Sequence, residues 1–251
     1  MIDQSPYTCR VEWGRRGARE AADRGDIVII VDVLSFSSTV VSALNFDAVI
    51  YPYPPNLDGK DYAHKVNAEY ILGRAEAAKA EKPTLSPVSF NNEHTNKKYV
   101  LTSFNGAFCT WMIASKVPAL FIGSLLNASS VAAVPNQLRL QKNASITVIP
   151  CGEMWSNRKE EEDTLRPAIE DYLGAGAILS YLEGDKSPEA EVCMGAFYHA
   201  ESKLDELIWD CGSGRELRER GFGDDVKHCS RLNAYQTVPV LKNNHFVRFN
   251  Q

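Results

Sequence analysis

The feature that most constrains this fold is a set of short apolar runs rich in valine and isoleucine. Residues 27–31 read IVIIV, with no alternation between polar and apolar positions. A run that is apolar on both faces is typical of a central strand in a parallel sheet, because helices cover both sides of such a sheet. The runs at 48–53, 99–104, 119–123 and 145–150 are similar. Segments with helical spacing separate them, which predicts an α/β fold with a mostly parallel sheet flanked by helices.

The remaining segments extend this prediction. The alanine-rich stretch 61–80 is amphipathic and is expected to form a helix, and the pattern becomes mostly helical from residue 187 onward, which predicts a helix-rich C-terminal third. Ser213 followed by Glu216 fits a capping box, and Asp224 is expected to cap the next helix. The final stretch TVPVLKNNHFVRF is expected to form one or two edge strands.

Length and charge restrict the class of protein. The 251 residues are 44% hydrophobic and include no linker-like tract, so residues 1–251 are expected to form a single domain. A net charge of −5 gives no long-range attraction to nucleic acid or an anionic membrane, and neither is expected as a partner. Without a long apolar run or a secretion signal, the expected location is the cytoplasm. The sequence leaves open whether the chain forms a homo-oligomer.

Common cofactor motifs are absent from the sequence. The six cysteines occur singly, without a CxxC pair, and are expected to be free buried thiols. The five histidines show no metal-ligand spacing. No GxxxxGK or GxGxxG pattern follows any of the apolar runs, so nucleotide binding of the common kinds is not supported.

Polar side chains gather where the first apolar run ends. Asp32 comes directly after IVIIV, and Ser35, Ser37, Ser38 and Thr39 follow where the next helix must begin. Ligands of open α/β sheets bind at the carboxyl ends of the strands, and free amide groups with hydroxyls at a helix start favour a phosphate. A carboxylate beside a phosphate would be repelled unless a divalent cation lay between them, which suggests Mg²⁺. Ordinary helix capping by these residues is the alternative.

Later loops carry a similar set of polar residues. Asn105 and Gly106 follow the run at 99–104, Asn127 follows the next run, and Glu153 follows the run at 145–150. Two further acids, Glu170 and Asp171, lie at the start of an expected helix. Acids at that position are also ordinary partners of the helix dipole, so this pair has two interpretations. The GAGA stretch that follows is interpreted as a close helix-packing surface.

Several of these motifs occur together in one known family. The stretches VDVLSFSST, LSPVS, SFNGA, GSLLNASSVA, IPCGEMW, LRPAIEDYLGAGAI and SGRELRERGFGDDV resemble, in order and spacing, the 2-phosphosulfolactate phosphatase family. The resemblance covers nearly the whole chain. It implies an α/β enzyme that hydrolyses the phosphate monoester of a small acidic metabolite with Mg²⁺ as cofactor, and 2-phosphosulfolactate is the expected substrate, with sulfolactate and phosphate as products.

The resemblance also suggests roles for individual residues. Asp32 and Ser37 are the expected catalytic residues. The expected metal ligands are Asp32, Glu153, Glu170 and Asp171. The residues expected to bind the substrate are Ser35, Ser38, Thr39, Ser86, Asn105, Gly106, Asn127 and Arg166.

Two departures from the family pattern concern the substrate. Many members carry an arginine directly after the VDVL stretch, where this chain has Ser35, and of the family's Asn-Ser-Pro motif only Ser86 and Pro87 are clear. An anion-binding cation is then missing or supplied from elsewhere, for example by Arg74 or Arg166. The chain is therefore expected to belong to a distinct branch, whose substrate could be another phosphorylated hydroxy acid.

The residues leave the nucleophile open between water, Asp32 and Ser37. Phosphatases of the haloacid-dehalogenase type use Asp-x-Asp-x-Thr after the first strand, and Leu34 at the third position argues against that mechanism. A non-catalytic protein that binds an anionic metabolite on the same fold is the main alternative from another class.

Overall fold

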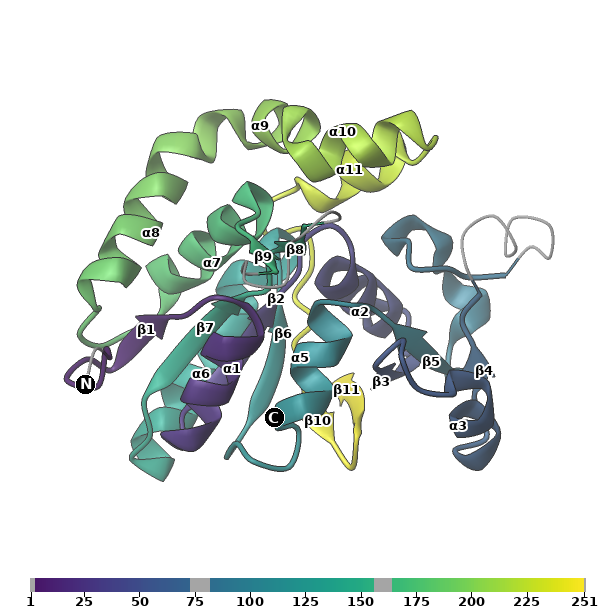
Figure 1. Ribbon diagram of the computed structural model, residues 1–251, viewed down its shortest axis with the longest axis horizontal. Coiled ribbons are helices and arrows are strands. Elements are labelled where there is room, and N and C mark those ends of the chain that lie inside the picture. Colours follow the sequence, from purple (N-terminus) through teal and green to yellow (C-terminus); the bar gives the residue numbers. More distant parts are fainter. Residues whose placement is uncertain (1–2, 73–81, 156–163, 251) are drawn as a thin grey trace.

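A nine-stranded sheet forms the centre of the molecule (Figure 1). The structure is a computed structural model, and it describes residues 3–72, 82–155 and 164–250. The strand order is β1-β7-β2-β6-β10-β11-β3-β5-β4. Pairing is parallel within β1-β7-β2-β6 and within β3-β5-β4. The α/β class with a mostly parallel sheet is confirmed.

The five apolar runs of the sequence form strands β2, β3, β5, β6 and β7. The strands of the parallel groups are β1 (Cys9–Val11), β2 (Ile27–Val31), β3 (Val49–Tyr53), β4 (Glu69–Tyr70), β5 (Lys98–Thr102), β6 (Leu120–Gly123) and β7 (Ile146–Pro150). The other strands are β8 (Glu153–Met154), β9 (Leu165–Arg166), β10 (Pro239–Lys242) and β11 (His245–Arg248). A separate two-stranded sheet is formed by β8 and β9, just beyond the carboxyl end of β7.

Helices occupy both faces of the sheet, and the later ones form an arch over its carboxyl end (Figure 1). They are α1 (Gly14–Asp23), α2 (Phe36–Asn45), α3 (Gly59–Lys65), α5 (Gly106–Ile113), α6 (Ala128–Lys142), α7 (Ile169–Tyr181), α8 (Pro188–Ala200), α9 (Leu204–Asp210), α10 (Gly212–Glu219) and α11 (Gly223–Cys229). The helix-rich C-terminal third is confirmed. Within the described residues, none of the helices is long and apolar enough to cross a membrane.

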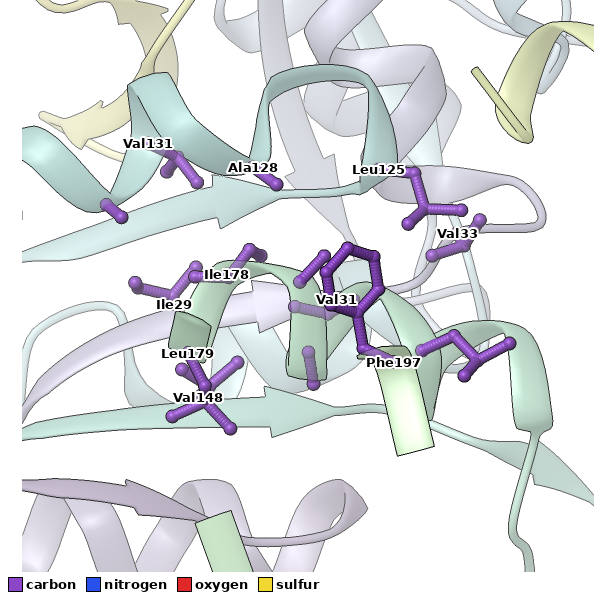
Figure 2. Packing of buried hydrophobic residues seen from close by; sticks show 14 of the residues in the cluster. Ile29, Val31, Val33, Leu125, Ala128, Val131, Val148, Ile178, Leu179 and Phe197 are labelled. Carbon is purple, nitrogen blue, oxygen red and sulfur yellow. The ribbon is translucent and has the colours of Figure 1, made fainter. Parts of the chain in front are cut away.

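The fully buried strand β2 explains the unbroken IVIIV run. Ile29 and Val31 face the cluster that α6, α7 and α8 cover, whereas Val28 and Ile30 face the cluster that α1, α2 and α5 cover. Figure 2 shows Ile178 of α7 beside Ile29 on the first of these faces. Since successive side chains of a strand point to opposite faces, a strand with helices on both sides must be apolar at every position.

The GAGA stretch of α7 packs closely against α8, as the sequence predicted. A Cβ atom on Gly176 would collide with the carbonyl oxygen of Cys193 and lie 2.9 Å from Cβ of Phe197. The prediction for the cysteines is also confirmed, because all six are free and buried.

The C-terminal hairpin lies inside the sheet, so the prediction of edge strands is wrong. Strand β10 pairs with β6 and β11 pairs with β3, both antiparallel, through Val240 opposite Phe121 and Phe246 opposite Ile50. The hairpin therefore joins the two parallel groups. Phe246 is fully buried. The sequence did not reveal this, because the segment contains a polar turn and lies at the end of the chain.

Three local predictions need correction. The helix expected over 61–80 ends at Lys65, Asn67 adopts a positive φ of 51°, and β4 follows beside β5. Residues 73–81, which include Arg74, lie outside the described residues. The expected caps are also wrong: Cys211, not Ser213, caps α10 by accepting the Gly214 N–H, and Asp224 lies in the first turn of α11 after Phe222.

Candidate active site

Asp32 lies between the amino ends of two helices. Its Oδ1 accepts the N–H of Phe36, the first residue of α2, at 3.1 Å. Its Oδ2 accepts the N–H of Gly106, the first residue of α5, at 2.8 Å, and the hydroxyl of Ser103 at 3.3 Å. Helix amino ends favour negative charge, so the two helices hold one carboxylate in a fixed orientation. This contact joins the β2 loop to the β5 loop, although β2 and β5 are not neighbours in the sheet.

The hydroxyl groups after Asp32 are mostly turned inward. Ser37 Oγ accepts the Asp32 N–H at 2.9 Å and donates to the Ile30 carbonyl at 3.3 Å. Ser38 donates to the Val33 carbonyl at 2.8 Å, whereas Thr39 Oγ1 is buried and has no hydrogen-bond partner among the described residues. These three side chains are fully buried and do not line the main cavity, whereas Ser35 does.

Asp171 connects two loops at the carboxyl ends of neighbouring strands. Its Oδ1 accepts the Val33 N–H at 2.7 Å, and its Oδ2 accepts the Gly152 N–H at 2.9 Å. Val33 follows β2 and Gly152 follows β7. The carboxylate thus satisfies two buried backbone donors and fixes the positions of Asp32 and Glu153, which flank these loops.

Glu153 contacts the third loop of the site. Its Oε2 accepts a hydrogen bond from Asn105 Nδ2 at 3.0 Å, and the pairing of β8 with β9 places it opposite Arg166. Glu170, which is 2% exposed, lies near enough to raise the pKa of both Glu153 and Asp171. The buried acids Asp32, Glu170 and Asp171 and the partly buried Glu153 therefore form one group, called here the acid cluster.

The acid cluster contains more negative charge than its surroundings neutralise. Burial and then the Asp32 and Glu170 carboxylates raise the pKa of Glu153 to about 8. Burial and the same two carboxylates raise the pKa of Asp171 well above its usual range. Burial also raises the pKa of Asp32, although the Gly106 and Phe36 N–H groups oppose that shift. Such clustered shifts are common where a protein has a functional site.

A cavity of about 550 Å³ opens onto part of this cluster. Asp32, Ser35, Asn105 and Glu153 line it, together with Ser103. Its other walls are the apolar side chains Leu34, Pro55, Leu85, Phe104, Met154, Trp155 and Leu217, together with Thr102 of β5, Ser213 and Glu216 of α10, and Arg220, which follows α10. The cavity therefore has an acidic side at the strand ends and a helical side at α10.

Other residues predicted for the site lie away from the cavity wall. Asn127 is fully buried and donates to the carbonyls of Ile122 and Thr237. Ser86 donates to Asp225, and a Cβ atom on Gly212 would lie 2.7 Å from Arg166 Nη2. The substrate-binding roles of Asn127, Ser86 and Arg166 thus stay predictions.

Sequence reasoning missed Ser103, Glu216 and Arg220. Ser103 lies at the end of β5, two residues before the predicted Asn105, so the rule that placed Asn105 could have found it. Glu216 was interpreted as part of a capping box, and nothing local to the sequence indicated that α10 covers the cavity. That contact depends on how the helical arch lies over the sheet (Figure 1).

The chemistry of the acid cluster fits a hard divalent cation. Mg²⁺ prefers oxygen ligands and is commonly held by one or two carboxylates together with substrate phosphate and water. Of the four predicted ligands, Asp32 and Glu153 line the cavity. In the part of the chain that the structure describes, no three His, Cys, Asp or Glu side chains form a ready-made metal site. The arrangement therefore fits a cation that is bound by two side chains and whose remaining coordination positions are filled by substrate and water.

Comparison with known proteins agrees with the motif resemblance. The sequence profile of the 2-phosphosulpholactate phosphatase family matches residues 16–244. A probable 2-phosphosulfolactate phosphatase of Pseudothermotoga lettingae is 28% identical over 235 residues, which cover 91% of this chain and 95% of that protein. The 2-phosphosulfolactate phosphatase of Methanothermobacter thermautotrophicus is 27% identical over 89% of this chain and 90% of its own. That of Methanocaldococcus jannaschii is 25% identical, with 87% and 90% covered.

The acid cluster and the cavity lie at the carboxyl ends of the strands, which is where open α/β sheets bind their ligands. Since the profile covers most of the sequence, this chain belongs to the 2-phosphosulfolactate phosphatase family, a family of phosphoric monoester hydrolases. The resemblance inferred from the motifs is thus confirmed.

Proposed function

We propose that the protein is a magnesium-dependent phosphatase that hydrolyses 2-phosphosulfolactate to sulfolactate and phosphate. The observation that carries this proposal is the acid cluster beside the 550 Å³ cavity, in a chain that belongs to this family. Asp32 and Glu153 would hold Mg²⁺. When bound, the cation would neutralise phosphate charge and stabilise the transition state.

The residues around Asp32 fix its position before the substrate binds. Gly106, Phe36 and Ser103 donate to its carboxylate, and Asn105 donates to Glu153. Preorganised groups of this kind need no rearrangement during the reaction. The apolar cavity wall, including Phe104 and Trp155, would limit the access of bulk water to the reacting phosphate.

Geometry narrows the choice of nucleophile. The Ser37 hydroxyl is engaged with two backbone groups and does not line the cavity. Of the three candidates that the sequence left open, water and the Asp32 carboxylate remain. Attack by water would break the bond between phosphorus and the alcohol oxygen of sulfolactate and give phosphate directly, whereas attack by Asp32 would break the same bond and form an aspartyl phosphate that water then hydrolyses.

The test is phosphate release from 2-phosphosulfolactate, measured with Mg²⁺ and with a chelator, for the unaltered protein and for Asp32→Asn. We expect metal-dependent turnover that falls by about 10²–10³-fold in Asp32→Asn, a loss typical of removing one key electrostatic group. Asp61→Asn is the control, because Asp61 is exposed and pairs only across one turn of α3 with Lys65. A circular dichroism melt establishes that each variant is folded.

No turnover by the folded, Mg²⁺-loaded protein would contradict the proposal. If the same protein still bound sulfolactate or phosphate, a non-catalytic role in binding an anionic metabolite would replace it. Turnover confined to other esters, such as 2-phosphoglycerate, would instead assign this branch of the family to another phosphorylated hydroxy acid.

A further inference from the structure

The helical side of the cavity carries a cation. Among the described residues that line the cavity, Arg220 is the only positively charged one, whereas Asp32, Glu153 and Glu216 are acids. A substrate with several negative groups needs a cation to bind the group that is not engaged by metal. The guanidinium group of arginine suits carboxylates and sulfonates because its N–H groups can donate in pairs to two oxygens.

Arg220 is anchored at its backbone and adaptable at its side chain. It follows the last residue of α10 and donates its N–H to the Glu216 carbonyl. Arg218 on the same helix stacks over Trp209 with its guanidinium carbon 4.6 Å from the ring centre, which ties α10 to α9. The base of the Arg220 side chain is therefore held on a packed helix at the cavity wall.

The present partner of Arg220 can be exchanged for a ligand. Its Nη1 donates to Glu216 Oε1 at 3.1 Å, with the two side chains 55% and 68% exposed. Ion pairs this exposed contribute little to stability, because water already solvates both groups. Arginine also has five N–H donors, so Arg220 can keep its bond to Glu216 and bind an anion with other donors.

We propose that Arg220 determines substrate specificity by binding the carboxylate or sulfonate group of the substrate, at the part of the cavity wall formed by α10 and the residue that follows it. This inference rests on the proposed phosphatase function. The phosphate would lie at the acid cluster with the cation, and the remaining acidic group would point toward α10. Glu216 positions the guanidinium group and keeps it at the cavity in the absence of substrate.

Three esters with phosphate on the middle carbon of a three-carbon chain test this assignment. 2-Phosphosulfolactate carries a carboxylate and a sulfonate, 2-phosphoglycerate carries one carboxylate, and glycerol 2-phosphate carries neither. We expect Arg220→Gln to raise KM for 2-phosphosulfolactate about tenfold or more, which is typical of losing a charge-assisted hydrogen bond, and to leave kcat within about twofold. KM for glycerol 2-phosphate should change less than about twofold.

Arg215→Gln is a matched control. Arg215 lies on the same helix, is also 55% exposed and pairs with Asp210 at 3.5 Å, but it does not line the cavity. Arg215→Gln should leave all three KM values unchanged.

Arg220→Lys keeps the charge without the paired donors and should recover only part of the lost affinity. An equal rise in KM for all three esters would overturn the assignment and indicate that Arg220 binds the phosphate, and an unchanged KM for 2-phosphosulfolactate would overturn it as well.

A binding measurement separates this inference from the phosphatase proposal. Sulfolactate has both acidic groups but no phosphate, so its binding can be measured by calorimetry even if the protein hydrolyses none of the esters. We expect Arg220→Gln to weaken sulfolactate binding about tenfold and Arg215→Gln to leave it unchanged. No binding by the unaltered protein, or equal binding by Arg220→Gln, would contradict the role of Arg220, whereas absence of turnover alone would contradict only the phosphatase proposal.

Discussion

Strand β2 is flanked by two buried aspartates in opposite environments. Asp26, just before the strand, accepts from Arg10 Nη1 at 3.0 Å, from Arg24 Nε at 3.0 Å and from Thr147 Oγ1 at 2.7 Å. Asp32, just after the strand, accepts only from uncharged donors in the described structure and lies among other acids. Both are at most 5% exposed.

The difference distinguishes a structural charge from a functional one. At the amino end of β2, two arginines neutralise the buried carboxylate, so its charge is balanced without a ligand. At the carboxyl end, the protein keeps several buried carboxylates together although burial and repulsion raise their pKa values. Ionising such a group of acids together is unfavourable for the folded state, and a cation bound beside the cavity, as proposed above, would offset that cost.

The largest expected effect on stability comes from Asp26, at the end of β2 where arginines neutralise the buried carboxylate. Asp26→Asn leaves Arg10, whose side chain is only 6% exposed, without its counter-charge among the described residues, and it leaves Arg24 paired only with Glu12 at 3.8 Å. Breaking one side of a buried pair should lower the free energy of unfolding by about 3–5 kcal/mol, measured by urea denaturation. Glu20→Gln removes exposed pairs with Arg16 and Arg19 and should cost less than about 1 kcal/mol. Equal losses in the two variants would contradict the comparison.

A smaller loss of stability is expected from a substitution at Gly106, where α5 approaches Asp32. A Cβ atom on Gly106 would collide with the ring of Phe36 and lie 2.8 Å from Asp32 Oδ2. Gly106→Ala should therefore cost about 1–3 kcal/mol of stability and lower kcat by about tenfold or more, because it displaces the carboxylate. Gly195→Ala, at a helical position with nothing within 4 Å, should be neutral or slightly stabilising. Full activity in Gly106→Ala would show that the position of Asp32 is unimportant.

The smallest effect is a pH dependence of the metal-free protein. The pKa of Glu153 is raised from 4.5 to about 8, so the folded state holds a proton that the unfolded state has lost between these values. Its contribution to stability is present below pH 4.5 and is lost as the pH rises through about 8. With a chelator present, Tm should therefore fall as the pH rises from 4.5 to about 8.

Glu153→Gln supplies the control for this pH dependence, because glutamine can keep the hydrogen bond from Asn105 but does not titrate. Its Tm should fall less over the same pH range. An identical pH profile in the variant and in the unaltered protein would mean that Glu153 does not carry the raised pKa.

The sequence predicted the parallel part of the fold because the signal there is local. Each buried strand is marked by its own apolar run, and polar residues at the strand ends identified Asp32, Asn105 and Glu153 as residues of one site. The insertion of β10 and β11 between β6 and β3 was not predictable in this way, since it depends on pairing between segments more than 100 residues apart.

The sequence predicted only those site residues that follow a strand. The contact of Asp32 with Ser103 and Gly106 crosses between strands that are not neighbours, and Arg220 reaches the cavity from the helical arch. Both depend on tertiary packing. The helix expected over 61–80 failed for a related reason, because the chain turns at Asn67 and pairs with β5, which local helix propensity does not reveal.

The most direct test of this account is a calorimetric titration of the metal-free protein with Mg²⁺ at neutral pH, in two buffers of different ionisation enthalpy. We predict saturable binding with release of about one proton, because a cation at the acid cluster would displace the proton that Glu153 holds below its pKa of about 8. Asp32→Asn should abolish this binding. Absence of Mg²⁺ binding, or binding that Asp32→Asn leaves unchanged, would contradict the interpretation of the acid cluster as the metal-dependent active site.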